Sequence, residues 1–252
     1  MKNSLDAIID AGLAPVYPMF EAHPDMIKLL RDMCMAVCVD CGNITPDMQQ
    51  FPVMLAKKSI SLFGANFAAV LGQVESLDSN FKVACDAGCS YCCSSHITLT
   101  PQEAFHIVLY LAANRSEDEF IRITEDCLSA AADYIPGQLN EFVKNYFRPC
   151  PFLTDNRCSI YEVRPIACRN WISTDLEACI KSYNTGNKVP VPQNALIMVQ
   201  KELVFTGQQA YLAGLGIEGG IGPFMPMLSQ ILIDFEGCYA KWLGGEKLNG
   251  QI

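Results

Sequence analysis

Residues 85–93 read CDAGCSYCC, and this short stretch decides how the rest of the chain is interpreted. The spacing of Cys89 and Cys92 lets two thiolates from one tight turn reach a single ion. Two thiolates complete the coordination of neither a tetrahedral ion nor a four-iron cluster, so further thiolates must come from another part of the chain. Residues 150–168, CPFLTDNRCSIYEVRPIAC, supply up to three more. We therefore expect the fold to clamp a metal centre between these two loops.

The predicted metal ligands are seven cysteines from the two segments: Cys85, Cys89, Cys92, Cys93, Cys150, Cys158 and Cys168. Adjacent cysteines normally project in different directions, so Cys92 and Cys93 both bind only in an unusual turn, to two metals, or to one polynuclear cluster. Seven thiols exceed the need of one ion, which favours an iron–sulfur cluster, [4Fe-4S], over zinc. We expect the ligands to be Cys89, Cys92 and two of Cys93, Cys150, Cys158 and Cys168. Cys85 is the next candidate. The alternative is that cysteine acts as a small apolar residue.

Composition narrows the classes of function. The chain has 252 residues, 50% of them hydrophobic, so a sizeable core is expected and disorder is excluded as the main state. A net charge of −9 argues against a nucleic-acid partner and against an anionic membrane surface. The longest apolar stretches are interrupted by charges such as Lys57 and Lys58, so we expect no membrane span. A protein partner is left open, as is the oligomeric state.

The expected compartment is the cytoplasm. Asp6 and Asp10 interrupt the apolar stretch that a secretory signal would need. Thiols stay reduced in the cytoplasm, and the 13 cysteines are an odd number, so a disulfide framework is disfavoured. Clustered cysteines in such a compartment more often hold metal.

The sequence predicts a mainly α fold, with irregular cysteine-rich loops. Thr100, Pro101 and Glu103 form the clearest start signal, a capping box with proline in the first turn. A second capping box, Ser116 with Glu119, opens another helix. Helices are expected at residues 24–41, 51–78, 101–114, 116–134, 192–213 and 227–243, and a further one after the turn at Pro136-Gly137 is expected to end at Tyr146. The 51–78 helix has a possible break at Gly64. Residues 147–172 are expected to be irregular, and 214–226 to be a glycine-rich connection.

Three regions follow from this pattern. Residues 1–80 form an N-terminal helical region, 81–172 the cysteine-cluster region, and 173–252 a C-terminal helical region. We expect them to pack as one compact unit.

Other residues have both a functional and a structural interpretation. Cys34, Cys38 and Cys41 lie on one face of the 24–41 helix, and we favour a packing stripe over a second metal site. His96 could supply an imidazole ligand, although a loop histidine is more common. Arg164 and Arg169 could offset the charge of a thiolate cluster, or they could pair with a local carboxylate. Cys127, Cys179 and Cys238 are interpreted as isolated thiols.

The two cysteine segments resemble a known family. Together with CDAGCSYCC, the residues Cys150-Pro151-Phe152-Leu153, Cys158, Ile160-Tyr161-Glu162, Arg164-Pro165 and Cys168-Arg169 are similar to the cysteine-cluster family described as zinc- or iron-chelating. The resemblance covers residues 85–171, and the first cysteine gap has three residues where many members have two. It implies metal or cluster binding. A relative within the family is the bacterial lysine N-methylase that acts on flagellin.

Three functions are therefore carried forward. The first is a cytoplasmic protein whose iron–sulfur cluster serves in electron transfer or redox sensing. The alternatives are a structural zinc protein and a lysine methyltransferase-like enzyme, the last by analogy alone. The Cys85-x3-Cys89-x2-Cys92 spacing is also that of radical S-adenosylmethionine enzymes, but no alternation of strands and helices follows it. No catalytic residue is assigned.

Overall fold

The computed structural model describes residues 2–248, and 63% of it is helical, which confirms the mainly α fold. In this range the α helices are α1 (Lys2–Leu13), α2 (Pro24–Cys41), α3 (Phe51–Leu77), α4 (Pro101–Asn114), α5 (Glu117–Ala131), α6 (Leu139–Asn145), α7 (Ile166–Asn170), α8 (Leu176–Asn184), α9 (Ala195–Gly214), α10 (Phe224–Ile233) and α11 (Phe235–Leu243). The short 3-10 helices are η1 (Tyr17–Phe20), η2 (Tyr91–Ser94) and η3 (Tyr161–Val163). The strands are β1 (Thr98–Leu99), β2 (Leu153–Thr154), β3 (Arg157–Cys158) and β4 (Gly222–Pro223).

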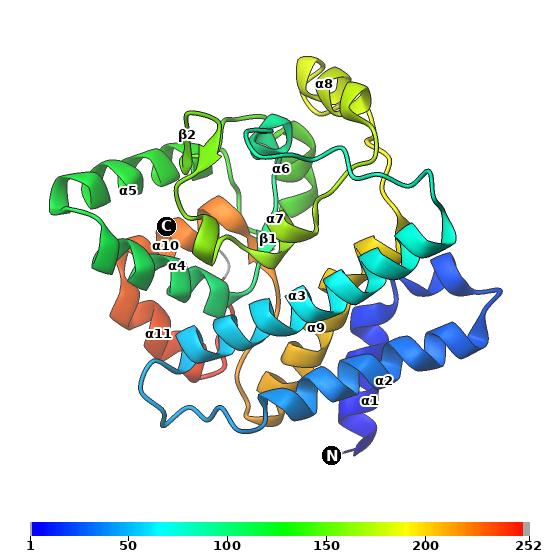
Figure 1. Ribbon diagram of the computed structural model, residues 1–252. Helices are drawn as coiled ribbons and strands as arrows, with labels where there is room; N and C mark the ends of the chain where they lie inside the picture. The colour runs from blue at the N-terminus through cyan, green and yellow to red at the C-terminus, as the bar shows by residue number, and fades with distance from the viewer. Residues whose placement is uncertain (1, 249–252) are drawn as a thin grey trace.

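Two groups of helices support the cysteine-rich loops. Helix α9 packs against α1, α2, α3 and α7, while α10 packs against α4, α5 and α11. The contact of α3 with α4 joins the two groups. Figure 1 shows the long helices α2 and α3 on one side, α5, α10 and α11 on the other, α7 between the two groups and α8 at the top. The loops therefore rest on a helical base.

Local signals in the sequence set two of the helices. Helix α2 begins at Pro24 and ends at Cys41, and α4 begins at Pro101 and ends at Asn114, as predicted. At the start of α4, the carboxylate of Glu103 accepts a hydrogen bond from the backbone N–H of Thr100 at 2.9 Å. The capping box satisfies N–H groups that have no partner within the helix.

Other predicted boundaries were wrong. Helix α3 continues through Gly64, because one glycine costs a helix only about 1 kcal/mol and packing against α4 and α9 outweighs it. The predicted helix 227–243 is two helices, since Asp234 ends α10 and caps α11 by accepting a hydrogen bond from Gly237 N at 2.9 Å. Helices α1 and α8 were not predicted.

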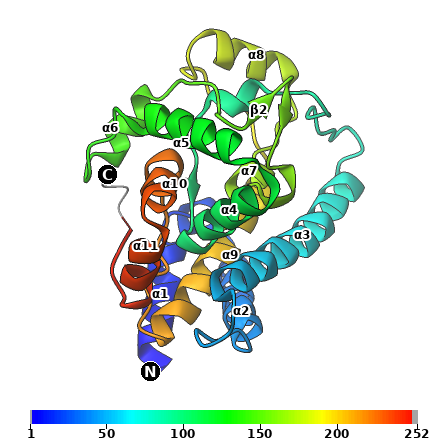
Figure 2. The same cartoon turned by 90° about the vertical axis from the view of Figure 1, so that its left-hand side faces the viewer.

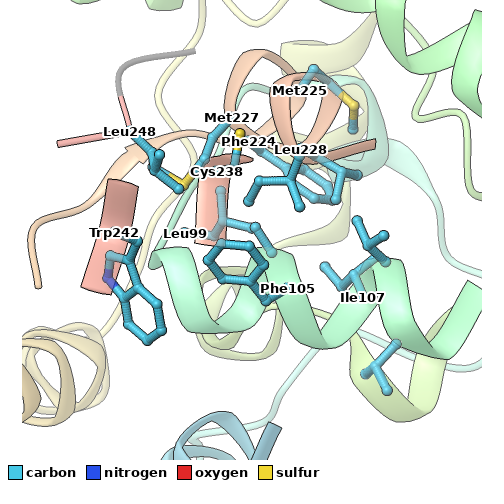
Figure 3. Packing of buried hydrophobic residues seen from close by; sticks show 14 of the residues in the cluster. Leu99, Phe105, Ile107, Phe224, Met225, Met227, Leu228, Cys238, Trp242 and Leu248 are labelled. Carbon is cyan, nitrogen blue, oxygen red and sulfur yellow. The ribbon is translucent and has the colours of Figure 1, made fainter. Parts of the chain in front are cut away.

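The largest core cluster lies between α4, α10 and α11. Figure 3 shows Leu99, Phe105, Ile107, Phe224, Met225, Met227, Leu228, Cys238, Trp242 and Leu248 within it. The rings of Phe105 and Trp242 are 5.4 Å apart, and both side chains are fully buried. Burial of each large apolar side chain contributes about 1.5–3 kcal/mol. This cluster fixes the position of Phe224 and Met225, which also reach the cysteine-rich loops.

Two short antiparallel strand pairs accompany the helices. Strands β1 and β4 are antiparallel, with Leu99 opposite Gly222, and they place the start of α10 beside the loop that carries Cys92 and Cys93. Strands β2 and β3 form a hairpin whose two turn residues, Asp155 and Asn156, have φ of 50° and 59°. Such angles are typical of a type I′ turn.

The predicted regions are closely interleaved. Helix α9, from the predicted C-terminal region, packs against α1, α2 and α3 of the predicted N-terminal region. The division at residues 80 and 172 stays a prediction.

Candidate metal centre

All seven cysteines predicted as ligands line one cavity of about 600 Å³. They come from the 85–93 loop and from residues 150–168, two segments that are far apart in the sequence. Apolar side chains from the core, including Phe152, Phe224 and Met225, form another part of the wall. The fold thus brings together the two loops that the sequence pattern pairs.

The turn at η2 brings both adjacent cysteines to the cavity. Residues 91–94 form a 3-10 helix, and the N–H of Cys93 donates a hydrogen bond to the carbonyl oxygen of Ser90 at 2.9 Å. From this tight turn both Cys92 and Cys93 line the cavity. At the start of the loop, the Sγ atom of Cys85 accepts a hydrogen bond from Ser173 N at 3.4 Å.

The second loop is fixed to the first by its backbone. Cys150 N donates a hydrogen bond to Cys93 O at 2.8 Å. Cys158 lies in β3 of the hairpin, opposite Leu153. Cys168 lies on α7, and the start of that helix is held by a hydrogen bond of 2.7 Å from Ile166 N to the buried carboxylate of Glu103. Each cysteine of this loop is therefore held by a separate local structure.

The thiols influence one another's ionisation. Burial raises the pKa of Cys168 well above its ordinary value, and the neighbouring Cys150, Cys158 and Cys93 raise it further. Burial likewise raises the pKa of Cys150 to about 12, with Cys93 and Cys158 as further contributions. Cys158 in turn is affected by Cys93. Every pair among these four thiols interacts, so a cation is needed to hold several of them as thiolates.

Cys92 and Cys93 form a coupled pair. The Cys92 thiol donates a hydrogen bond to Cys93, which lowers the pKa of Cys93 and raises that of Cys92. The guanidinium of Arg164 also lowers the pKa of Cys93. Cys93 is thus the thiol of the pair that ionises more readily.

Comparison with known families agrees with this geometry. Residues 84–187 match the CxxCxxCC family, described as a "putative zinc- or iron-chelating domain". The resemblance to the cysteine-cluster family is thereby confirmed. The match covers less than half of the chain, and it supports metal binding without distinguishing zinc from iron. Comparison with curated proteins and comparison with solved structures gave no match.

The thiols of the cavity fit zinc or iron, because both metals accept thiolates and the cavity offers up to seven. Within residues 2–248, no three His, Cys, Asp or Glu side chains stand close enough together to form a ready-made ion site. The thiols line the wall of a cavity and do not converge on one ion position.

Arg164 and Arg169 both line the cavity. The guanidinium carbon of Arg164 lies 4.2 Å from the centre of the Tyr161 ring, and its charge acts to lower the pKa of Cys158 and Cys168. Arg169 also acts to lower the pKa of Cys158, and it donates hydrogen bonds to the carbonyl oxygens of Tyr161, Glu162 and Arg164, which closes the loop around η3. Both guanidinium groups therefore offset negative charge, and Arg169 orders the loop as well.

The aromatic wall is partly open. Tyr161 and Trp171 both line the cavity. Their exposed fractions are 59% and 37%, so the cavity opens to solvent on this side.

His96 lies on the wall shared by the main cavity and a second one of about 230 Å³. Its ring packs edge-on against Phe142 and Tyr146, and burial lowers its pKa to about 4. Its Nε2 atom is buried and has no hydrogen-bond partner in the described chain. The imidazole is therefore neutral at pH 7.

Sequence reasoning missed the position of Cys179. This thiol lines the second cavity together with Cys92. Burial raises the pKa of Cys85, and the charge of the nearby Cys179 thiolate raises it further. It lies on α8, which packs against η2. Its separation from the cysteine motif left no spacing signal that could have revealed this proximity.

The three cysteines of α2 do not line the cavity that holds the other seven. Cys34 and Cys41 are fully buried, and α2 packs against α9. Close approach at this point depends on Gly207, where an added Cβ would lie 2.5 Å from Cys34 O and 2.6 Å from Val37 Cβ. Burial raises the pKa of Cys34 and Cys41 to about 12. This placement favours the packing stripe over a second metal site.

Proposed function

We propose that the chelating domain holds a [4Fe-4S] cluster and that the protein serves in electron transfer or redox sensing. The observation that supports the proposal is the arrangement of seven thiols around one cavity of about 600 Å³. A single ion with four thiolates at about 2.3 Å needs no such space. One water molecule in the liquid takes up about 30 Å³, so the cavity has room for a group of many atoms.

In this proposal four thiols are the preferred ligands, and they differ from the set led by Cys89 and Cys92 that the sequence spacing favours. Cys93, Cys150, Cys158 and Cys168 are the set in which every pair interacts. Four thiolates match the ligand number of a cubane cluster. Cys93 lies on η2, Cys150 just before the hairpin, Cys158 in its strand β3 and Cys168 on α7, so the ligands would connect the two loops.

The remaining residues have distinct roles in this proposal. When bound, a cluster of this type supplies one-electron transfer. Arg164 would compensate the negative charge of the thiolates, and Phe224 and Met225 would keep water from the inner wall. The exposed side near Tyr161 and Cys85 would face a redox partner. The proposal assumes a reducing compartment such as the cytoplasm.

The metal and sulfide content of protein purified without oxygen tests the proposal. We expect about four iron atoms and as many sulfides per chain, the content of a [4Fe-4S] cluster. Cys168→Ser should lower both contents, whereas Cys238→Ser, which removes a buried thiol of α11 outside the cavity, should leave them unchanged. One zinc without sulfide would refute the cluster.

A structural zinc site is the second candidate. The four mutually interacting thiols could close around one tetrahedral ion and leave no open position for chemistry. In that case zinc removal should lower the urea midpoint of unfolding, and no visible absorption band should be present in the purified protein. A cluster predicts the opposite spectroscopic result, so the two candidates are distinguished in one preparation.

A further inference from the structure

The outward face of α3 is distinct from the metal centre and has no partner within the described chain. Figure 2 shows this helix along one edge of the molecule, with its C-terminal half extending outward. Its inner face packs through Ala56, Ser59 and Phe63, which are buried. The side chains on the opposite face, including Ala65 and Ala68, are exposed.

This outward face lacks the charges that normally cover a water-facing helix. No charged residue occurs between Lys58 and Glu75. An 18-residue window of α3 has a mean hydropathy of 1.2, and only 11% of that window is buried. A surface helix usually carries charged and polar side chains opposite its apolar stripe. The composition therefore indicates that something covers this face.

The exposed residues repeat with the period of a coiled coil. Successive gaps of three and four residues separate Lys58, Ser61, Ala65, Ala68, Gly72 and Glu75. Five of the six are exposed and Lys58 is half-buried. A repeat of 3.5 residues keeps one seam of a helix turned toward a partner helix. Small residues in the seam allow two backbones to approach closely, and a Cβ added at Gly72 would meet nothing within 4 Å.

The charges and the small residues of the seam are arranged symmetrically about one point. The midpoint of Lys58 and Glu75 falls between residues 66 and 67, and the same midpoint relates Ser61 to Gly72 and Ala65 to Ala68. An antiparallel copy of the same helix therefore places each Lys58 opposite a Glu75, at both ends of the contact. Charge complementarity and close packing are satisfied together by this one partner.

We propose that the outward face of α3 binds the same face of a second copy of this chain, as an antiparallel helix pair. The seam from Lys58 to Glu75 is about 25 Å long at 1.5 Å per residue. Lys58 Nζ also lies 4.0 Å from an Asp40 oxygen, but an exposed pair at that distance contributes little. Interfaces of modest size associate weakly, so the dimer forms in a concentration-dependent manner.

A lipid surface fits the same face less well. Helices that insert into a membrane present large apolar side chains such as Leu and Phe to the lipid. The centre of this seam consists of Ala and Gly, and the larger Phe63 and Phe67 are turned toward the protein interior, where they pack in one cluster. Lipid binding is therefore an outcome of the test that would overturn the proposal.

Sedimentation velocity on the full chain tests the dimer. We expect the weight-average mass to rise toward twice that of the chain as the concentration increases through about 100 μM. Ala68→Trp should block the close approach and shift the dissociation constant at least about tenfold. Ala113→Trp, at an exposed alanine on α4, is the matched control and should change nothing.

Charge exchange tests the orientation. Lys58→Glu alone and Glu75→Lys alone should each weaken the dimer, because each places like charges opposite one another, and the double variant should restore it. A chain that stays monomeric throughout, or a dimer that tolerates Ala68→Trp, would overturn the proposal. Single charge variants without effect would exclude the antiparallel pairing. Co-flotation with phosphatidylcholine vesicles, lost on Ala68→Glu, would assign the face to lipid instead.

Discussion

Replacing Glu103 by alanine is expected to destabilise the fold and to loosen the metal centre together. Glu103 is 2% exposed, and its carboxylate accepts hydrogen bonds from Thr100 N at 2.9 Å, Thr100 Oγ1 at 2.9 Å and Ile166 N at 2.7 Å. The first two bonds cap α4. The third holds the first residue of α7, two positions before Cys168. One side chain therefore connects the helical base to a predicted metal ligand.

The magnitude follows from the groups left behind. Alanine leaves the buried N–H groups of Thr100 and Ile166 without an acceptor, and each such loss costs about 1–3 kcal/mol. The expected decrease in the free energy of unfolding is thus about 2–6 kcal/mol, a large part of the ~5–15 kcal/mol typical of a folded protein. Glutamine keeps one acceptor oxygen, so Glu103→Gln should lose roughly half as much.

Urea unfolding and metal analysis together measure the effect. Glu103→Ala should lower the midpoint of unfolding and reduce the metal bound per chain. Glu119→Ala removes the equivalent carboxylate from the exposed capping box of α5, where it accepts a hydrogen bond from Ser116 N at 3.0 Å. That variant should show a much smaller shift and full metal content. Equal behaviour of the two variants would refute the role assigned to the contact with Ile166.

Three further predictions concern other parts of the molecule. Gly207→Ala should destabilise the protein by about 1–3 kcal/mol, because the new Cβ would overlap Val37, whereas Gly214→Ala on the same helix has free space and should be neutral in urea unfolding. The pKa of His96 is lowered to about 4 by burial, so its contribution to stability is present above the unfolded value of 6.5 and is lost as the pH falls toward 4. His96→Gln should abolish that loss, which amounts to at most about 3 kcal/mol. The test is the midpoint of unfolding measured as a function of pH for both proteins. Parallel pH dependences of the two midpoints would refute the reasoning. Arg164→Gln should raise the pKa of the nearby thiols and slow their alkylation in metal-free protein by up to about tenfold, the effect of one pKa unit. An unchanged alkylation rate would show that the guanidinium does not act on them.

Much of the fold could be predicted because its signals are local. The starts of α2 and α4 depend on Pro24, and on Thr100 with Glu103, which act on their own helices. The interruption at Asp234 also had a local signal, a capping side chain, which the apolar run around it concealed. Helix α8 was missed because it is short and polar, and its packing on η2 is a contact between distant segments.

The candidate site shows the same limit. Spacing alone identified the seven cysteines, and the structure places all of them on one cavity. Spacing could not identify the walls supplied by Phe224 and Met225, which come from α10, or the proximity of Cys179 to Cys85. These positions depend on how helices pack, and no pattern within the two loops records that packing.

The hydrogen bond from Cys150 N to Cys93 O joins the two cysteine-rich loops through main-chain atoms. It closes a loop of roughly 60 residues, so the chain-entropy cost of bringing the two segments together is met by the fold itself. Neither cysteine side chain takes part in this contact. A serine at residue 93 or 150 would therefore remove a thiol and leave the two segments side by side, which separates the loss of a donor from the loss of the fold.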